Sequence, residues 1–354
     1  MTTMQRDAFA RLIDAVQTNC HVADARHAAD MTLCIYLLQM REFYRWEQGI
    51  AALQPLPRDA VGAWIARRET LWASLEEADF VPVPVQGRGF DPFDVDPINA
   101  ALRQVGLVYG AGYTGPGRAC FVLGELQHAQ QREGVELLEV GREHARGLAA
   151  PPAALAGSTV LLRHEALARW VWDRYEAWTL KRNPGPFKAA LDAHDFEHLG
   201  PVAVERLIAA EGETLVLHEL GEFRAAQRLG PAWPALRIAP CSRRTQLLTS
   251  ALRDHLADCL VTLPTLLARR ADASIHFWFA NLEGVRAELF PRLAAAYAAW
   301  CAGDGGAALH EALDAGQRHW QQCCDRLLAL QQAHGDDATP HLDAALREPG
   351  GLRL

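Results

Sequence analysis

The chain has 354 residues, of which 50% are hydrophobic, so it is long enough for one large domain or two ordinary ones with a sizeable buried core. Its 35 Lys and Arg against 43 Asp and Glu give a net charge of -8, which argues against a general binder of nucleic acids or anionic membranes. The N-terminal residues lack a signal-peptide core, and no stretch reaches the ~18 to 20 apolar residues of a membrane span, so we expect a cytoplasmic protein.

Helical patterns begin and end the chain. Amphipathic spacing predicts helices over 5–19, 24–48 and 58–77, and the Pro- and Gly-rich stretch 82–97 predicts a loop. A short helix at 97–104 is followed by brief apolar or alternating runs, which are typical of strands. Beyond them the pattern predicts helices over 163–182, 187–193, 200–229, 244–271, 282–302, 306–333 and 340–347, whereas the aromatic run 274–280 fits helix or strand.

These elements predict a mainly α fold, a multi-helix bundle with a small β-containing insert. The expected parts are N-terminal helices (1–80), a loop-rich, β-containing insert (81–163, with its strands in 105–163) and a main helical bundle (164–354). We expect the N-terminal helices and the main bundle to form one compact unit. Eight scattered cysteines include no C-x-x-C pair, so the sequence predicts neither a zinc ribbon nor a disulfide framework.

One stripe of the 200–229 helix carries metal-ligand residue types. Because each helical residue turns by about 100°, Glu211, His218 and Glu222 fall within roughly 40° of one another. Such side chains are costly to bury without partners, so the stripe faces water, a metal ion or other polar groups. The next helix adds Asp254 and Asp258, one turn apart.

The preferred hypothesis is a metal-dependent enzyme, with a di-metal oxidase or oxygenase acting on a small organic substrate as its sharpest form. Carboxylate and imidazole ligands suit iron or manganese, which would activate oxygen or water. The predicted ligands are Glu211, His218, Glu222, Asp254 and Asp258. His276 is predicted as a further ligand or a general base, and Glu165 as a second catalytic candidate. We also expect a homodimer.

The alternative is a non-catalytic helical binding or assembly protein. In that interpretation Arg163, Arg169 and Arg253 neutralise the same acids in a buried network that holds helices together. A third feature is Gly110–Gly115, which spells G-x-G-x-x-G but lacks the following helix that dinucleotide binding requires. The alternatives there are a plain turn or a loop over a ligand, with contacts from Tyr109, Tyr113 and Arg118.

The Glu-to-His spacing of seven residues resembles that on the first ligand helix of haem-oxygenase-like di-iron oxygenases. The paired Glu-x-x-His motifs of ferritin-like proteins are not reproduced on these helices, since Leu215 and Leu252 stand three residues before His218 and His255, and the one Glu-x-x-His, Glu125 to His128, lies in the insert. Over most of its length the chain resembles a bacterial family known only as a domain of unknown function, which implies no activity. The segments that carry this second resemblance are 34–47, 217–222, 253–260 and 276–286.

Overall fold

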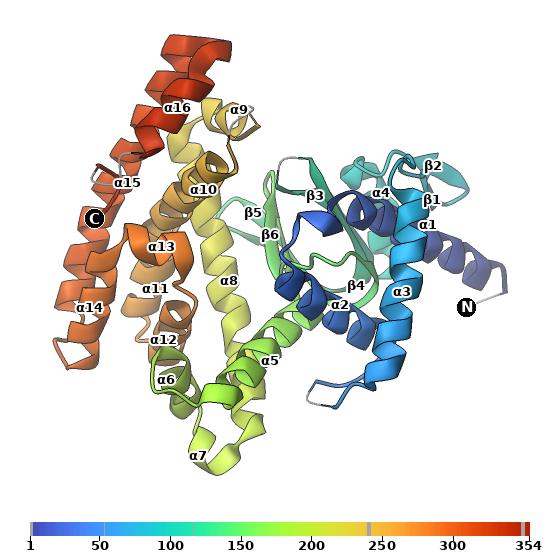
Figure 1. The fold of residues 1–354 in the computed structure, drawn as a ribbon, viewed down its shortest axis with the longest axis horizontal. Helices are drawn as coiled ribbons and strands as arrows, with labels where there is room; N and C mark the ends of the chain where they lie inside the picture. Colours follow the sequence, from blue (N-terminus) through green and yellow to red (C-terminus); the bar gives the residue numbers. More distant parts are fainter. Residues whose placement is uncertain (1–2, 53, 116, 239–241, 348–350) are drawn as a thin grey trace. The chain divides into compact units, whose positions relative to one another are not determined.

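The computed structural model describes residues 3–52, 54–115, 117–238, 242–347 and 351–354. These residues form two compact units, 1–176 and 177–354 (Figure 1). The N-terminal helices belong to the same unit as the strands, whereas the sequence grouped them with the C-terminal helices. Within the described residues, no helix has both the length and the apolar character needed to cross a membrane.

Unit 1 begins with three α-helices and a 3-10 turn, and the first of these helices packs on the sheet. They are α1 (Thr3–His27), the 3-10 turn η1 (Ala28–Asp30), α2 (Leu33–Glu47) and α3 (Arg58–Leu75). The predicted start of a second helix at residue 24 is wrong, because α1 continues to His27 and the chain breaks at 28–32. Tertiary hydrogen bonds explain why polar residues do not end α1 earlier: the Asn19 side chain pairs with both backbone groups of Val81, at 2.7 and 2.9 Å.

The strands of unit 1 form a hairpin and a larger sheet. The hairpin joins β1 (Val83–Val85) to β2 (Arg88–Phe90) inside the stretch predicted as loop, and α4 (Val95–Leu102) and η2 (Arg103–Val105) follow. The five-stranded sheet has the order β3-β4-β5-β7-β6. Its strands are β3 (Leu107–Gly115), β4 (Arg118–Arg132), β5 (Val135–Arg146), β6 (Ala153–Ala156) and β7 (Thr159–Arg163).

Only the β5–β7 pair of this sheet is parallel among the described strands. Register shifts interrupt the β4–β5 pairing on either side of Gly124, and β-bulges of this kind bend long strands. A side chain at Gly124 would lie 2.4 Å from Val140 Cγ1, so glycine is required there. The apolar side of α1, including Leu12 and Val16, packs on Phe121 and Leu123 of the sheet.

The described residues of unit 2 form helices joined by turns and loops, with no strand among them. Unit 2 begins within α5 (His164–Lys181). The other helices are α6 (Pro186–Ala193), α7 (Phe196–Leu199), α8 (Pro201–Leu229), α9 (Ala232–Ile238), α10 (Arg243–Ala257), α11 (Leu263–Ala268), α12 (Asp272–Ala280), α13 (Gly284–Leu289), α14 (Pro291–Cys301), α15 (Ala307–His334), the 3-10 turn η4 (Gly335–Asp337) and α16 (Ala338–Arg347). The ambiguous aromatic run is therefore a helix, α12.

A π-helical turn, η3 (Asp258–Thr262), joins α10 to α11. Pro264 explains this wider turn, because proline donates no hydrogen bond and its ring clashes with the carbonyl four residues earlier. Nearby, α8 crosses α10 so closely that a Cβ atom on Gly221 would lie 2.5 Å from the Ala257 carbonyl oxygen. Glycine at position 221 therefore sets how near the two helices approach.

The mainly α class is confirmed, and helices occupy nearly all of the ranges predicted for them. The multi-helix bundle is not confirmed as the architecture of the whole chain, since unit 1 contains a five-stranded sheet with strands of up to 15 residues. The insert predicted as small is thus a substantial part of a separate unit. Pro116 and Cys241 lie outside the described residues.

Candidate metal centre

Three of the predicted ligands meet in unit 2, on α8 and α10. One ligand atom from each of His218, Glu222 and Asp254 lies within 4.8 Å of the other two. His218 and Glu222 are one helical turn apart on α8, and the His218 Nε2 to Glu222 Oε1 distance is 3.5 Å. Among the described residues, this is the one group of three or more His, Cys, Asp or Glu side chains spaced to hold a metal ion.

Asp258 holds the other nitrogen of the His218 ring. The His218 Nδ1 to Asp258 Oδ1 distance is 2.8 Å, so Nδ1 donates to the carboxylate and Nε2 faces Glu222. Metal-binding histidines commonly donate their second ring N–H to a carboxylate, which fixes the ring and makes it a stronger ligand. Asp258, predicted as a ligand, lies where such a carboxylate would lie relative to the His218 ring, and it is not in the group of three ligand atoms. The Asp258 carboxylate also accepts hydrogen bonds from Trp278 Nε1, at 3.3 Å, and from the Arg286 guanidinium.

The local helix geometry accounts for the different roles of Asp254 and Asp258. Asp258 is the first residue of the π-helical turn, where the backbone leaves the regular α-helical path. Its side chain is 1% exposed, whereas that of Asp254 is 21% exposed. The π-helical turn therefore coincides with the change from the more accessible Asp254 carboxylate to the buried Asp258 carboxylate. Single π-turns inside α-helices are frequent at functional sites.

The charges at this site are tightly coupled. Burial by itself would lower the pKa of His218, but the Asp258 charge and hydrogen bond, together with Glu222, raise it well above its ordinary value. Burial would raise the pKa of Asp258, but the His218 and Arg286 charges lower it. Burial and the Glu222 charge raise the pKa of Glu219 to about 7, so an additional carboxyl group in this cluster titrates near neutral pH.

Arg253 contacts two of the three residues in the group. Its guanidinium donates to Glu222 and, at 3.1 Å, to Asp254 Oδ1. Both carboxylates are thus neutralised in part by arginine, as the alternative interpretation predicted for Arg253. The other two arginines of that prediction are placed wrongly: Arg163 and Arg169 belong to unit 1, where both pair with Glu143 at 2.9 and 3.3 Å.

Glu211 does not join the group, although it shares the α8 stripe. It is fully buried, and its Oε1 accepts a hydrogen bond from Ser274 Oγ at 2.8 Å. Seven residues of α-helix span about 10.5 Å, so Glu211 lies two turns from His218. Its partner Ser274 is near the start of α12, whereas the α12 residue that contacts Asp258 is Trp278. Burial raises the pKa of Glu211 to about 7, against the opposing effect of the Ser274 hydrogen bond.

Replacing Glu211 with glutamine is expected to make stability less dependent on pH. A carboxyl whose pKa rises from 4.5 to about 7 on folding favours the folded state most below pH 4.5, and that advantage is lost as the pH rises through 7. At pH 8 the Glu211→Gln variant should be more stable than the wild type by about 2 to 3 kcal/mol, and near pH 4.5 the two should be similar. Thermal unfolding from pH 4.5 to 8 measures this difference, and parallel curves would refute it.

The two predicted catalytic residues have partners of their own. His276 Nδ1 and the Tyr297 hydroxyl form a hydrogen bond of 2.6 Å, the ring centroids of His276 and Trp300 are 4.9 Å apart, and burial lowers the pKa of His276. It is not among the ligand atoms grouped around His218. Glu165 lies in unit 1, where its carboxylate accepts a hydrogen bond from the Glu143 N–H at 3.1 Å. Their catalytic roles remain predictions.

The predicted ligand loop is part of strand β3. Tyr109 is buried and its hydroxyl donates to the Pro92 carbonyl, whereas Tyr113 is 63% exposed and stacks on Phe93 with ring centroids 5.1 Å apart. Both tyrosines line a cavity of about 210 Å³. Arg118 instead pairs with Asp30 at 3.1 Å. The absence of a dinucleotide-type helix after this stretch agrees with the prediction, since β4 follows.

Two residues of the site were not predicted from the sequence. Gly221 allows α8 and α10 to approach, and Trp278 donates to Asp258. A glycine inside an otherwise strong helix pattern was the available signal for the first, because such a position commonly marks close packing. The aromatic run around Trp278 fits helix or strand equally in the sequence, and its indole N–H gives no indication of its partner.

Two family models together match most of the chain. Residues 11–163 match the N-terminal domain of a family of unknown function (DUF6866), and residues 168–349 match its C-terminal domain. No curated protein and no solved structure matches the chain. The two matched domains meet near the division between the two structural units, and His218, Glu222 and Asp254 all lie in the second. The chain belongs to the DUF6866 family, with its N-terminal and C-terminal domains in that order.

Proposed function

We propose that the protein is a metal-dependent enzyme whose second unit binds one divalent transition-metal ion through His218, Glu222 and Asp254. The observation that carries the proposal is the two-sided environment of the His218 ring. Asp258 holds Nδ1 at 2.8 Å, while Nε2 faces Glu222 within the group of three ligand atoms. A carboxylate–histidine pair of this kind orients an imidazole for metal binding.

The donor set favours the metals predicted from the sequence. One imidazole and two carboxylates suit iron or manganese better than a thiolate-preferring metal. Three protein ligands leave coordination positions for water or a substrate, as in catalytic sites. We therefore retain an oxidase or oxygenase acting on a small organic substrate as the proposed reaction class. A single ion replaces the di-metal form, because Glu211 and Asp258 are bound elsewhere.

The charge balance leaves room for a cation. The carboxylates of Glu219, Glu222, Asp254 and Asp258 face three basic groups, His218, Arg253 and Arg286. Each carboxylate has about four lone-pair sites, so Arg253 can keep a contact with Glu222 or Asp254 while another lone pair binds the ion. His218 must release its Nε2 proton on binding, and its raised pKa therefore makes metal affinity fall as the pH falls.

Metal analysis of protein purified without chelator tests the proposal. We expect about one equivalent of iron or manganese, and an Mn²⁺ affinity at least tenfold weaker in His218→Ala, because the imidazole ligand is gone. The exposed His310 on α15 provides a matched control, and His310→Ala should bind as the wild type does. Only trace transition metal, unchanged by His218→Ala, would exclude the metal site.

A second candidate is the non-catalytic binding or assembly protein, and the contacts of Arg253 favour it. Its guanidinium donates to both Glu222 and Asp254, which completes an ion-pair network without a metal. Thermal unfolding separates the two candidates. A bound ion stabilises the folded state as its concentration exceeds the dissociation constant, whereas the purely structural network leaves the unfolding temperature unchanged by Mn²⁺. The cytoplasmic location and the homodimer stay predictions.

A further inference from the structure

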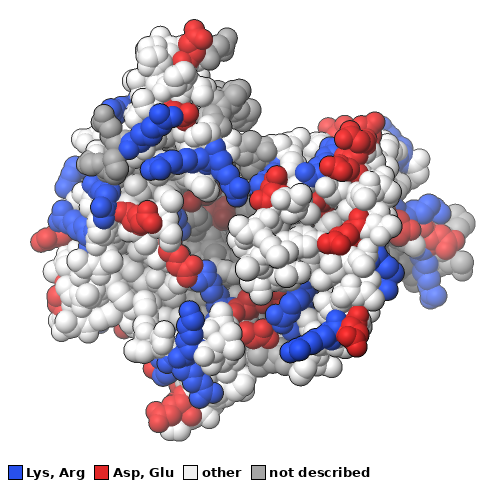
Figure 2. Space-filling model, in the orientation of Figure 1, with Lys and Arg blue, Asp and Glu red and all other residues white. Residues whose placement is uncertain are grey.

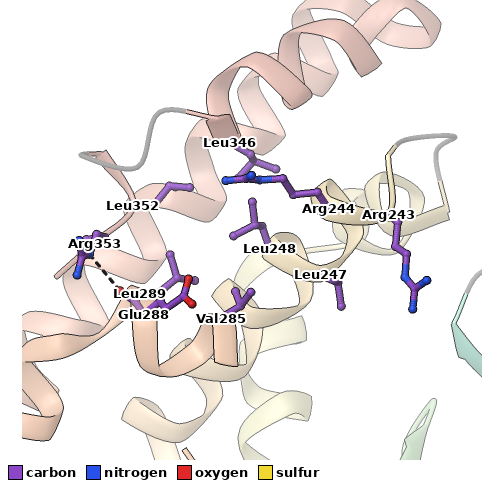
Figure 3. Close-up of a pocket in the computed structure, with 10 residues that line it drawn as sticks. All are labelled: Arg243, Arg244, Leu247, Leu248, Val285, Glu288, Leu289, Leu346, Leu352 and Arg353. Atoms are coloured by element: carbon purple, nitrogen blue, oxygen red, sulfur yellow. Dashed lines mark hydrogen bonds between the residues drawn. The ribbon is translucent and has the colours of Figure 1, made fainter. Parts of the chain in front are cut away.

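A cavity in unit 2 lies at the N-terminal end of α10. Its volume is about 670 Å³, within the range of small-molecule sites. α10, α13, α16 and the C-terminal residues surround it, and Figure 3 shows their side chains around the open space. The apolar lining consists of Leu247, Leu248, Val285, Leu289, Leu346 and Leu352.

Basic side chains border this apolar lining. Figure 3 shows the Arg244 side chain lying across the cavity between Leu346 and Leu248, whereas Arg243 points away from it. Arg353 lies on the opposite side, where its Nε donates to the Glu288 backbone carbonyl at 3.1 Å. On the face drawn in Figure 2, basic side chains also gather over the region where α10 begins.

Arg244 is exposed and makes no hydrogen bond or ion pair with any described residue. Its guanidinium is therefore available for a planar anion, which arginine binds through two parallel hydrogen bonds. Among the described residues that line the cavity, Glu288 is the acidic one, and with Arg243 turned away, Arg244 and Arg353 still give these side chains a net positive charge. An apolar floor beside an unpaired cation is complementary to a ligand with an apolar chain and an anionic head.

We propose that this cavity binds a single-chain amphipathic anion, an acyl chain ending in a carboxylate, with Arg244 on the head group and the leucines on the chain. Each methylene removed from water contributes about 0.8 kcal/mol, so chain length should set affinity and Arg244 should set the preference for an anion. The site goes beyond the proposed metal function. It shares α10 and α13 with the metal centre, but none of the three ligands lines it.

Calorimetric titration of the metal-free 354-residue chain with decanoate tests this assignment. Decanol serves as the uncharged ligand of equal chain length, and hexanoate as the short anion. We expect decanoate to bind with a 1:1 stoichiometry and at least tenfold more tightly than either. Decyl phosphate distinguishes a general preference for anionic heads from one for carboxylate.

Charge reversal supplies the structural test. Arg244→Glu should weaken decanoate binding at least tenfold, and Arg206→Glu, at an exposed position on α8, should leave it unchanged. Because both positions are exposed, folding should be retained, and unfolding curves check this. Equal binding of decanol and decanoate, unchanged affinity in Arg244→Glu, or no decanoate binding would overturn the proposal. None of these outcomes depends on metal binding at His218.

Discussion

Replacing Asp258 with alanine is expected to destabilise the protein by about 3 kcal/mol. Asp258 is buried and contacts His218, Arg286 and Trp278, so its removal leaves two basic groups without their carboxylate. Breaking a buried ion pair by removing one partner costs about 3 to 5 kcal/mol. The lower value applies here because the Arg286 side chain is 26% exposed and partly solvated.

The effect should also depend on pH in a defined way. The raised pKa of His218 contributes stability that is fully present below 6.5 and is lost as the pH rises through the folded value. The lowered pKa of Asp258 contributes stability that is present above 3.8 and is lost as the pH falls through the folded value. The Asp258→Ala variant should therefore lose most stability, relative to the wild type, between about pH 4 and 6.5.

Denaturant unfolding of the full chain measures this loss, with Asp314→Ala as the control. Asp314 is an exposed aspartate on α15, and surface substitutions of this kind usually change stability by less than about 0.5 kcal/mol. In the same variant, proton NMR should show a lower pKa for His218, because its main charge partner is gone. Equal stability of Asp258→Ala and Asp314→Ala at pH 6 would contradict the assigned role of Asp258.

Replacing Gly221 with alanine should destabilise the protein by about 1 to 3 kcal/mol and weaken metal binding. The added Cβ would lie 2.5 Å from the Ala257 carbonyl oxygen and 2.9 Å from its carbon, which are backbone atoms with little freedom to move. α8 and α10 must then separate. Since Ala257 precedes Asp258, the 2.8 Å contact between His218 and Asp258 should lengthen.

The sign of this effect makes the test decisive. In a helix without close neighbours, alanine is more stable than glycine by about 0.8 to 1.0 kcal/mol. Gly62 on α3 is such a position, because no described atom outside the neighbouring backbone of its own helix lies within 4 Å of the Cβ that would be added there. We expect Gly62→Ala to stabilise the chain and Gly221→Ala to destabilise it. If both stabilise it equally, Gly221 does not set the approach of the two helices.

Local periodicity predicted the elements of the fold better than their grouping. The α8 bounds follow from a long helical pattern between Gly200 and Gly230, and both glycines are its caps. The end of α1 at His27, before the break at 28–32, was not predictable. Asn19 and Asp24 favour an earlier helix end, but hydrogen bonds to Val81 and Leu148 stabilise them inside α1. Such contacts join residues more than 60 positions apart, and no local pattern contains them.

The candidate metal centre shows the same limit. His218 and Glu222 were predicted together because one helical turn separates them. Glu211 has the same angular position but lies two turns away, so its contact is with Ser274. The π-helical turn then distinguishes Asp258 from Asp254, although a regular helix would place them on one face. Arg163 was expected near these acids from its place in the chain, yet Glu143 on the neighbouring strand is its partner.

Pulsed electron paramagnetic resonance of the Mn²⁺-loaded protein tests the central claim most directly, because it detects nitrogen atoms bound to the ion. The proposed ligands include one imidazole, His218, so we predict coupling to a single histidine nitrogen. That coupling should disappear in His218→Ala and persist in His310→Ala. Bound Mn²⁺ without nitrogen coupling, or coupling that survives in His218→Ala, would contradict a metal ion held by His218, Glu222 and Asp254.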